Sequence, residues 1–392
     1  MKIKRLVVVL TILTLVAALL PLTAQAVTLK EGTRSQGVEA LQQALKSKGY
    51  FSATSTGYYG DITVAAVKSY QKDNGLTADG IAGKDTLTAL GLMSMYIVAE
   101  TDYRFFVRLA PAAYLLSMGL STAVLFVGQE INGSRRWLNF GPLSFQPSEF
   151  AKAAVILFLT WQIQGSKKTT AGFWFMCRTM LTLLPIVGLV GSNNLSTAII
   201  ILGIGVILIF ISDPGYARFI GMGVTGAAVI AVFLAAESYR LERLAIWRNP
   251  EKYEKGFQTI QGLYAIGSGG LFGRGFGSSL QKLGFVPEAQ NDMIFSIICE
   301  ELGLTGAFFL IGIFGLLMWR LMVIALHCRE LQGTLLCVGI MSHMAIQVIL
   351  NIAVVTNTIP NTGITLPFIS YGGTSVVFLL GEMGLALSVS RK

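Results

Sequence analysis

Asp292 stands where an acidic side chain could act as a general base. It closes a long charged stretch, residues 237–292, and an apolar run begins directly after it. Burial at such a boundary favours a carboxylate that takes up a proton readily. Aspartate in front of a helix also accepts hydrogen bonds from the first backbone N–H groups of that helix. The residue by itself supports a catalytic role and a capping role equally.

The stretch before Asp292 is suited to an anion that carries a lipid tail. Residues 262–277 contain seven glycines, and residues 237–292 contain seven basic and six acidic side chains. Glycine lets backbone N–H groups approach an anion closely, and arginine and lysine suit a diphosphate. The apolar surroundings suit a lipid chain. A mixed charged loop that only faces solvent is the alternative.

Residues 132–138 (NGSRRWL) and 146–152 (QPSEFAK) form a second polar cluster. The Pro-Ser pair before Glu149 is typical of a helix start. Lys152 follows Glu149 by three positions, so the two charges can pair on one helix face. Charged side chains at membrane depth are costly and are functional candidates by default. A pair that only stabilises the helix start is the alternative.

A third cluster, residues 361–375 (NTGITLPFISYGGTS), cannot form one continuous helix, because Pro367 and the pair Gly372-Gly373 interrupt it. Irregular backbone near membrane depth occurs where it is buried in protein or lines a cavity. We therefore expect this cluster to form part of a cavity wall. Glu382 follows in the next apolar run, where hydrogen bonding inside the bundle is its expected role.

The composition places these clusters in a membrane protein. Of 392 residues, 53% are hydrophobic and 13% are charged, and the mean hydropathy is +0.64. Soluble domains contain about 25% charged residues, so a purely cytosolic enzyme is excluded. The net charge of +9 suits basic cytoplasmic loops and anionic lipid, and without a long Lys/Arg run it does not indicate nucleic-acid binding. Four cysteines near apolar runs form no disulfide framework, and two histidines exclude a zinc enzyme.

Apolar runs from about residue 105 onward predict an all-α fold, a polytopic transmembrane helix bundle of about eight spans. Basic residues in alternate breaks, such as Lys167-Lys168 and Arg391-Lys392, place these breaks and the C-terminus in the cytoplasm. The expected spans are 109–128, 150–164, 177–191, 195–211, 217–236, 293–317, 332–356 and 374–390. The loops expected outside are 129–149, 192–194, 237–292 and 357–373.

Two segments precede the bundle, which we assign to residues 93–392. Residues 1–26 have a basic start, an apolar run and an Ala-Gln-Ala cleavage pattern. They predict a secretory signal peptide, with an uncleaved anchor as the alternative. Residues 27–92 are polar, with helical apolar spacing and turn dipeptides such as Asp79-Gly80. They predict a small exported three-helix domain of about 60 residues.

Residues 27–92 carry a recognisable pattern of glycine turns and core positions. Its pieces are Gly37-Val38, Leu41-Gln42, Gly49-Tyr50, Tyr59-Gly60, Thr63, Ala66-Val67, Tyr70-Gln71, Asp79-Gly80 and Gly83. This pattern resembles the peptidoglycan-binding type 1 domain. Because turns and core positions specify a fold more than a ligand, the resemblance concerns the fold first. It implies a module outside the membrane that binds peptidoglycan.

The polar clusters of the bundle carry long motifs in a fixed order. These are NGSRRWL, LSFQPSEFAK, GFQTIQGLYAIGSGGLFGRGFGSSLQKLGFVPEAQNDMIFSIICEELG and PNTGITLPFISYGGTS. Residues 102–392 therefore resemble the SEDS family, the division, elongation and sporulation proteins typified by FtsW, RodA and SpoVE. The resemblance implies a membrane peptidoglycan glycosyltransferase that polymerises lipid II in cell division, elongation or sporulation. It also implies a class B penicillin-binding protein as partner, beside the surrounding membrane lipid.

The same resemblance implies roles for individual residues. The essential aspartate of the family falls on Asp292, which would activate the acceptor sugar hydroxyl for attack on the donor's anomeric carbon. Undecaprenyl diphosphate leaves and needs cationic stabilisation, for which we nominate Arg243, Lys282 and Lys152. No dedicated metal site is legible, and a divalent cation such as Mg²⁺ or Mn²⁺ could help to neutralise the diphosphate. The further candidates for substrate binding are Glu149, Arg136, Trp137, Glu288, Ser370, Tyr371 and Gly372.

The chain also departs from the family pattern. It lacks the family's first two spans, in whose place stand the signal sequence and the peptidoglycan-binding-like domain. The only bridge from this domain to residue 102 is residues 90–99, which are too few for an ordinary span. Asn194 replaces the aspartate of the family's Pro-Asp-Leu, and Gln290-Asn291 replaces its frequent His-Thr.

Two other functions fit the same features. A transporter of lipid II could use the same cavity and basic loop, and a non-catalytic scaffold could bind the wall and division partners. Loss of function in Asp292→Ala, with expression and partner binding retained, would favour the enzyme. Under each reading the chain is a multi-pass protein of the bacterial cell membrane, with residues 27–92 outside the cytoplasm.

Overall fold

This computed structural model describes most of the chain from residue 42 onward. The signal peptide or anchor expected at 1–26 lies outside the described residues, as do parts of 27–92. The described residues are 42, 45–46, 49–56, 58–73, 84–131, 134–140, 143–165, 172–213, 215–235, 238–283, 286–287, 289–370 and 373–392.

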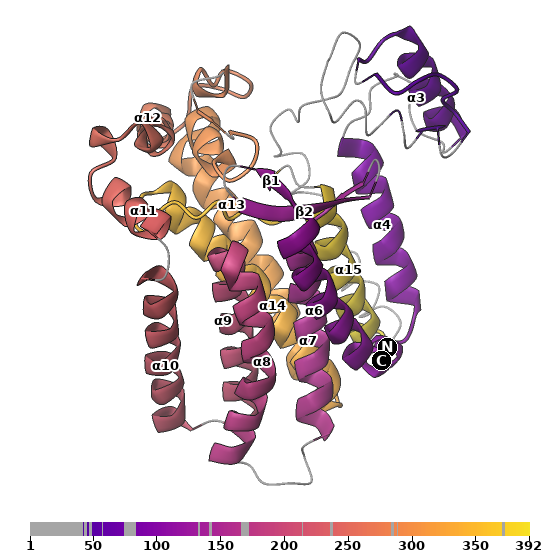
Figure 1. Cartoon of the computed structure of the whole chain (residues 1–392), viewed down its shortest axis with the longest axis vertical. Coiled ribbons are helices and arrows are strands. Elements are labelled where there is room, and N and C mark those ends of the chain that lie inside the picture. The colour runs from indigo at the N-terminus through magenta and orange to yellow at the C-terminus, as the bar shows by residue number, and fades with distance from the viewer. Residues whose placement is uncertain are drawn as a thin grey trace.

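Each apolar run expected to span the membrane forms a helix (Figure 1). The helices are α6 (Ala110–Val127), α7 (Pro147–Gly165), α8 (Phe173–Asn193), α9 (Leu195–Ser212), α10 (Tyr216–Ala235), α13 (Ile294–His327), α14 (Leu331–Val355) and α15 (Gly373–Ser390). Within the described part of the chain, five of them, α6, α8, α9, α13 and α14, are long and apolar enough to cross a membrane. The apolar parts of α10 and α15 are the shorter stretches Phe219–Ala228 and Ser375–Ser390. A multi-pass bundle is thus confirmed, and the count of eight spans stays a prediction.

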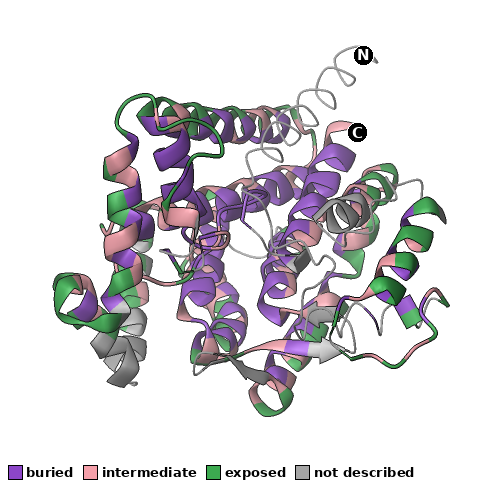
Figure 2. Cartoon of the chain, turned by 90° about the horizontal axis from the view of Figure 1, so that it is seen from above, coloured by how far each residue is buried: buried purple, intermediate pink, exposed green. Residues whose placement is uncertain are grey.

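The core of the bundle lies around α9 and α14. Helix α9 packs against α7, α8 and α14, and α14 also contacts α13 and α15. Seen from above, buried residues gather at the centre of the bundle (Figure 2). Glycine permits the closest crossings: a Cβ on Gly205 would lie 2.2 Å from Leu183, and one on Gly203 would lie 2.7 Å from Ile346. Small residues at such crossings let membrane helices approach and pack tightly.

The segment between α6 and α7 corrects the all-α prediction. It forms a three-stranded antiparallel sheet in the order β1-β2-β3, made of β1 (Gln129–Ile131), β2 (Ser134–Phe140) and β3 (Leu143–Phe145). The Asn-Gly dipeptide at 132–133 is a strong sequence signal for a tight hairpin, and the aromatic residues of β2 favour a strand. A reading of 129–149 as a plain loop overlooks both signals.

Helix α4 (Lys84–Glu100) packs along α15, so residues 90–99 belong to a longer helix rather than to a short bridge (Figure 1). Its 17 residues extend for about 25 Å at about 1.5 Å per residue. Met95 is buried against α15, where a Cβ on Gly384 would lie 2.6 Å from the Met95 backbone oxygen. The boundary expected between residues 92 and 93 therefore falls inside a continuous helix.

The described part of the N-terminal region has a small core of its own. Leu45, Phe51, Tyr59 and Val67 are buried together, and α3 (Asp61–Asp73) contributes to them. The side chain of Gln42 links separate segments of this unit by hydrogen bonds. Its Nε2 donates to the Thr63 hydroxyl over 2.8 Å and to the Tyr58 backbone oxygen over 2.7 Å, and its Oε1 accepts from Thr56 N over 2.8 Å. The end of residues 27–92, where the last of the three expected helices would lie, is the beginning of α4.

The long loop 237–292 is largely folded and lies at the same end of the bundle as the sheet (Figure 1). It contains two helices that the sequence analysis did not anticipate. These are α11 (Ser238–Arg248) and α12 (Phe257–Gly269), with the short turns η2 (Pro250–Lys252), η3 (Glu254–Gly256) and η4 (Gln281–Leu283). Helix α12 packs against α13, so this end of the molecule is a built surface.

At the opposite end, a polar cluster joins the start of α5 (Tyr103–Arg108) to the residue before α14. The Tyr103 hydroxyl donates to Glu330 Oε2 over 2.8 Å, and Arg104 Nε donates to the same oxygen over 3.1 Å. These donors, the Arg104 guanidinium first, hold the pKa of the Glu330 carboxyl below its usual range. Lys392 also belongs to this cluster, because its Nζ pairs with the Asp102 carboxylate over 3.0 Å.

Candidate active site

Polar side chains from several helices converge on one irregular segment, residues 361–370, which connects α14 to α15. Arg243 of α11 donates to the backbone oxygen of Asn361 over 3.4 Å. Ser196 of α9 donates to the backbone oxygen of Thr362 over 2.9 Å. No helix or sheet ladder satisfies the backbone of such a segment, so side chains must supply the partners. The cavity wall expected here is thus a segment fixed by its neighbours.

Asp292 lies two residues before the start of α13, and its exposed fraction is 8%. Gln258 of α12 donates to its Oδ1 over 3.3 Å, and Asn351 of α14 donates to its backbone oxygen over 2.8 Å. The same Asn351 amide donates to the backbone oxygen of Ile364 over 2.7 Å. The N-cap position of α13 belongs to Met293, one residue later. Asp292 is therefore held at the segment and does not occupy the capping position.

Arg243 reaches Asp292 through two amide side chains. Asn361 Nδ2 donates to Gln258 Oε1 over 3.2 Å, and Gln258 Nε2 donates to Asp292 Oδ1. Arg243 is exposed, whereas Asp292 is buried. The structure thus brings together a solvent-accessible guanidinium and a buried carboxylate, both of which the sequence analysis nominated.

Ser370 fixes the far end of the segment. Its hydroxyl donates to the backbone oxygen of Asn291 over 2.6 Å and accepts from Leu366 N over 2.6 Å. Phe368, between these contacts, is buried with a φ of 63°, in the left-handed region that favours glycine. Such a conformation persists only where the surroundings enforce it, and it is frequent at functional sites. Ser370 therefore positions the residue next to Asp292.

Glu149 and Lys152 form a buried ion pair at the start of α7. The Lys152 Nζ to Glu149 Oε1 distance is 2.9 Å, and the side chains are 2% and 7% exposed for Lys152 and Glu149. Lys152 Nζ also donates to Gln347 Oε1 over 3.1 Å, and Gln347 Nε2 donates to the backbone oxygen of Thr365 over 3.0 Å. The pairing expected from the spacing is present, and it extends to the segment 361–370.

Lys282 lies elsewhere, against a kink in α13. Its Nζ donates to Glu301 Oε1 over 2.7 Å and to the backbone oxygen of Gly277 over 2.8 Å. The kink is at Gly303, whose φ of 67° and ψ of −167° are not helical. Lys282 is a partner of an acid here and has no described contact with the segment 361–370.

The glycine-rich loop before Lys282 directs its backbone N–H groups at the acids of this kink. Glu301 accepts from the backbone N–H of Gly277 over 3.1 Å and of Ser279 over 3.4 Å. Glu300 accepts from Leu280 N over 3.2 Å and from Gln281 N over 3.3 Å. The loop is an anion cradle, as its glycines indicate, and these carboxylates are the anions that it binds in this structure.

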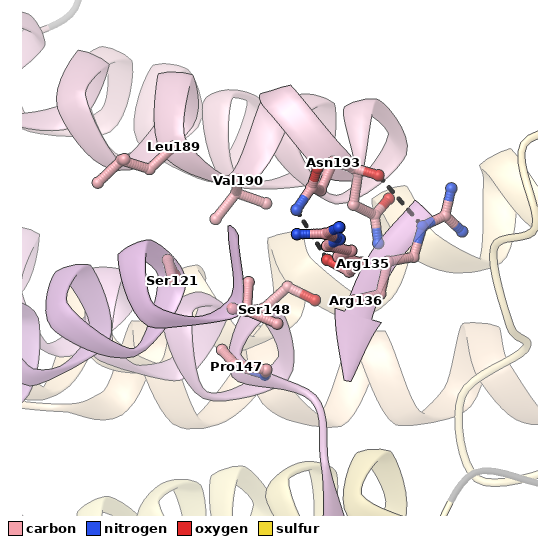
Figure 3. A pocket seen from close by; sticks show the side chains of 10 residues that line it. Ser121, Arg135, Arg136, Pro147, Ser148, Leu189, Val190 and Asn193 are labelled. Carbon is pink, nitrogen blue, oxygen red and sulfur yellow. Dashed lines mark hydrogen bonds between the residues drawn. The ribbon is translucent and has the colours of Figure 1, made fainter. Parts of the chain in front are cut away.

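Arg136 lies on β2 at the rim of a small pocket between the sheet and the ends of α6, α7 and α8 (Figure 3). Its Nε donates to the backbone oxygen of Asn193 over 3.1 Å, and Asn193 Nδ2 donates to the backbone oxygen of Arg135 over 2.7 Å. Val190 and Pro147 contribute apolar surface to the same pocket. Trp137, the next residue of β2, is half-buried. Arginines beside apolar surface suit an anionic lipid headgroup.

Asn194, the departure from the family's aspartate, is the N-cap of α9. Its side chain accepts from Thr197 N over 3.2 Å. Asparagine caps helices as well as aspartate does, so the loss of the acid leaves the start of α9 intact.

Three nominated residues, Glu288, Tyr371 and Gly372, lie outside the described residues. Among the residues that are described, no group of three or more His, Cys, Asp or Glu side chains could hold a metal ion. A divalent cation carried by the diphosphate stays a prediction.

Sequence analysis missed the amides that build the site: Gln258, Gln347 and Asn351. Gln347 and Asn351 stand four residues apart in an otherwise apolar helix, and this spacing puts both on one face. Polar side chains in membrane helices usually face the bundle interior and a functional path. That rule, applied to α14, would have found two of the three.

Comparison with known proteins identifies the family of this chain. The family model for cell cycle proteins of the FtsW, RodA and SpoVE group matches residues 53–392. The chain is 38% identical over 314 residues to stage V sporulation protein E of Bacillus subtilis, covering 77% of this chain and 84% of that protein. It is 34% identical over 314 residues to a probable peptidoglycan glycosyltransferase FtsW of Saccharophagus degradans, covering 78% and 81%.

Solved structures give the same relationship. A structure that describes the coordination of polymerization and crosslinking by a peptidoglycan synthase complex matches with a TM-score of 0.68 and 29% identity, over 92% of this chain and 98% of that chain. The rod shape determining protein RodA of Thermus thermophilus, crystallised as an aspartate-to-alanine mutant, matches with a TM-score of 0.62 and 27% identity, over 97% and 96%. The family match begins at residue 53, well before residue 102, where the sequence resemblance starts. The chain therefore belongs to the cell cycle protein family of FtsW, RodA and SpoVE.

Proposed function

We propose that Asp292 is the general base with which this chain, a peptidoglycan glycosyltransferase, polymerises lipid II. The carboxylate takes the proton from an acceptor sugar hydroxyl as the hydroxyl oxygen bonds to the donor's anomeric carbon. The bond from that carbon to undecaprenyl diphosphate breaks, and the diphosphate leaves with the bonding electrons. One observation carries the assignment: Asp292 is buried, yet amides from α12 and α14 bind it at the segment that Arg243 also reaches.

Arg243 stabilises the leaving diphosphate in this proposal. Its guanidinium is exposed at the edge of the site and presents several N–H donors, which suits a diphosphate better than a point charge does. Lys152 and Lys282 are paired with Glu149 and Glu301. Each of these carboxylates competes with a phosphate for its lysine, so we assign the leaving diphosphate to Arg243.

The proposal includes two partners. A class B penicillin-binding protein accompanies the enzyme, as the similarity to a peptidoglycan synthase complex supports. The N-terminal region, residues 27–92, lies outside the cytoplasm and binds peptidoglycan, which keeps the enzyme near existing wall. The small core around Tyr59 and α3 supports a folded unit in this region.

The test is glycan-strand synthesis from purified lipid II by the full chain in detergent, with and without a cognate penicillin-binding protein. We expect polymer from the wild type and a loss of rate of about 10²–10⁴-fold in Asp292→Asn, the contribution typical of general base catalysis. Asn291→Asp is the matched control, because it moves a carboxylate by one position, and it should not rescue Asp292→Asn.

The outcomes also separate the other functions. Full activity in Asp292→Asn would show that Asp292 is not the general base. A wild type that makes no polymer but moves lipid II between the leaflets of vesicles would point to a transporter. A wild type that does neither, yet binds the partner and the wall, would point to a scaffold.

A further inference from the structure

His343 and Glu382 form a buried pair that the proposed reaction does not use. His343 Nδ1 lies 2.8 Å from Glu382 Oε2, and both side chains are 2% exposed. His343 belongs to α14 and Glu382 to α15. Placing such groups between membrane helices is costly unless they are paired and bonded. The pair is therefore expected to have a structural or functional role, which its other contacts indicate.

The second ring nitrogen of His343, Nε2, contacts a residue of the candidate active site. His343 Nε2 lies 2.9 Å from Gln347 Oε1, the oxygen that also accepts from Lys152 Nζ. An ammonium group can only donate, so the oxygen of the Gln347 amide must face Lys152. The amide nitrogen then faces Thr365, donating to its backbone oxygen over 3.0 Å and to its hydroxyl over 3.3 Å.

This orientation fixes the hydrogen on the imidazole. Gln347 Oε1 has no hydrogen to offer, so His343 Nε2 must carry one. Glu382 Oε2 faces Nδ1 over 2.8 Å, and one hydrogen from either group completes this contact. The contact at one ring nitrogen orients the other. Glu382 thus holds the imidazole in the orientation from which Nε2 donates to Gln347.

We propose that His343 and Glu382 are positioning residues, which act through Gln347 to hold the segment 361–370 against Asp292. The path runs from Gln347 to Thr365, and the neighbouring Ile364 shares the Asn351 amide with Asp292. Neither His343 nor Glu382 touches substrate in this scheme. The inference rests on the proposed function, because its effect on rate requires that Asp292 be the base.

Two substitutions at His343 test the contacts of its two ring nitrogens separately. Glutamine places an amide nitrogen near the position of Nε2, so His343→Gln keeps a donor for Gln347 and loses the contact with Glu382. Asparagine reaches only the position of Nδ1, so His343→Asn keeps the contact with Glu382 and loses Gln347. We expect kcat of His343→Gln within about 3-fold of wild type, and kcat of His343→Asn lower by about 10-fold or more with KM for lipid II unchanged.

Glu382 offers the same comparison. The amide of Glu382→Gln can donate to Nδ1, which keeps the hydrogen on Nε2 and should preserve kcat. Glu382→Leu leaves the buried Nδ1 without a partner, lets the imidazole turn away from Gln347 and should reduce kcat as His343→Asn does. Melting temperature in detergent is measured for all four variants. A merely structural role predicts that activity follows melting temperature in each pair, and that result would overturn the proposal.

Hydrogen–deuterium exchange of residues 361–370 supplies a readout that does not depend on turnover. We expect His343→Asn and Glu382→Leu to raise deuterium uptake in this segment, while His343→Gln and Glu382→Gln leave it near the wild-type level. Equal uptake in all four variants would overturn the inference. If the wild type makes no polymer, the proposed function fails, and the exchange data still decide whether His343 positions the segment.

Discussion

Asn351 donates a hydrogen bond of 2.8 Å to the backbone oxygen of Asp292, so a side chain of α14 sets the position of the residue that precedes α13. The same amide holds Ile364. Asn351 is 0% exposed. Two pieces of chain that are distant in sequence are thus fixed by one buried donor, which makes the geometry of the proposed base depend on a residue that never meets the substrate.

Asn351→Leu is expected to lower kcat by about 100-fold, because a carboxylate displaced by about 1 Å loses most of its advantage as a base. The measurement is polymer formation at saturating lipid II, with the circular dichroism of the bundle as the check on folding. Asn351→Asp keeps the size but cannot donate when ionised, and it should behave like the leucine variant. Activity near wild type in either variant would contradict this role.

Arg243→Gln should reduce the rate by about 10²-fold or more, the usual effect of removing one donor that stabilises developing charge. Arg243→Lys keeps the charge without the planar fork, so an intermediate rate is expected. The assay compares kcat and KM for lipid II in both variants. The nearby Arg248→Gln is the matched control on α11, and a loss of the same size there would mean that Arg243 acts only through general surface charge.

Lys152→Met leaves the Glu149 carboxylate buried without its cation. Breaking a buried pair in this way costs about 3–5 kcal/mol, whereas removing both charges is often neutral. We therefore expect a large drop in melting temperature for Lys152→Met and a partial recovery in Lys152→Met/Glu149→Gln. Additive losses in the double variant would show that the two side chains do not stabilise each other.

Gly273→Ala tests whether the glycine-rich loop is a packed element. Gly273 has a φ of 77°, and a Cβ there would lie 2.1 Å from the Glu301 backbone oxygen. Gly277 has a φ of 80°, but a Cβ there would meet nothing within 4 Å. Gly277→Ala should cost only the left-handed conformation, about 1–2 kcal/mol, and Gly273→Ala clearly more. Thermal unfolding of both variants measures the difference in stability. Equal losses of stability would mean that the loop can move away from the Glu301 backbone and is not tightly packed against it.

Glu330 predicts a dependence of stability on pH. Arg104, the main cause, and Tyr103 lower the pKa of the Glu330 carboxyl in the folded chain. A group whose folded pKa is lowered contributes stability above its unfolded pKa, about 4.3, and loses it as pH falls through the folded value. The melting temperature of the wild type should therefore fall more between about pH 5 and about pH 3 than that of Glu330→Gln. Because both side chains of the Arg104–Glu330 pair are more than 40% exposed, the difference should be small and should shrink in high salt.

The sequence predicted the parts of this molecule that depend on local pattern. Apolar runs at membrane depth satisfy their backbone hydrogen bonds internally as helices, so α6 to α10 and α13 to α15 were predictable as helices. The pairing of Glu149 with Lys152 followed from helix geometry. The role proposed for Asp292 came from a family resemblance, since position alone could not separate a base from a cap.

What the sequence did not reveal depends on contacts between distant segments. The spacing of Lys282 says nothing of Glu301, which it binds, and its contact with substrate stays a prediction. Residues 90–99 were read as a short bridge because the apolar run is short, and the sequence did not show that they belong to the longer helix α4, which packs against α15. The amides of α14, four residues apart on one helix face, were overlooked because the apolar run was read only for its length.

The packing of α4 against α15 has a consequence for how the chain is made. Arg391 donates to the backbone oxygen of Ala99, a contact across 292 positions. During synthesis α4 leaves the ribosome almost first among the described helices, and its neighbour leaves last. For nearly the whole of translation α4 must therefore remain without the helix that covers it, since contacts of such separation form late. A chain truncated before α15 would leave this face of α4 bare.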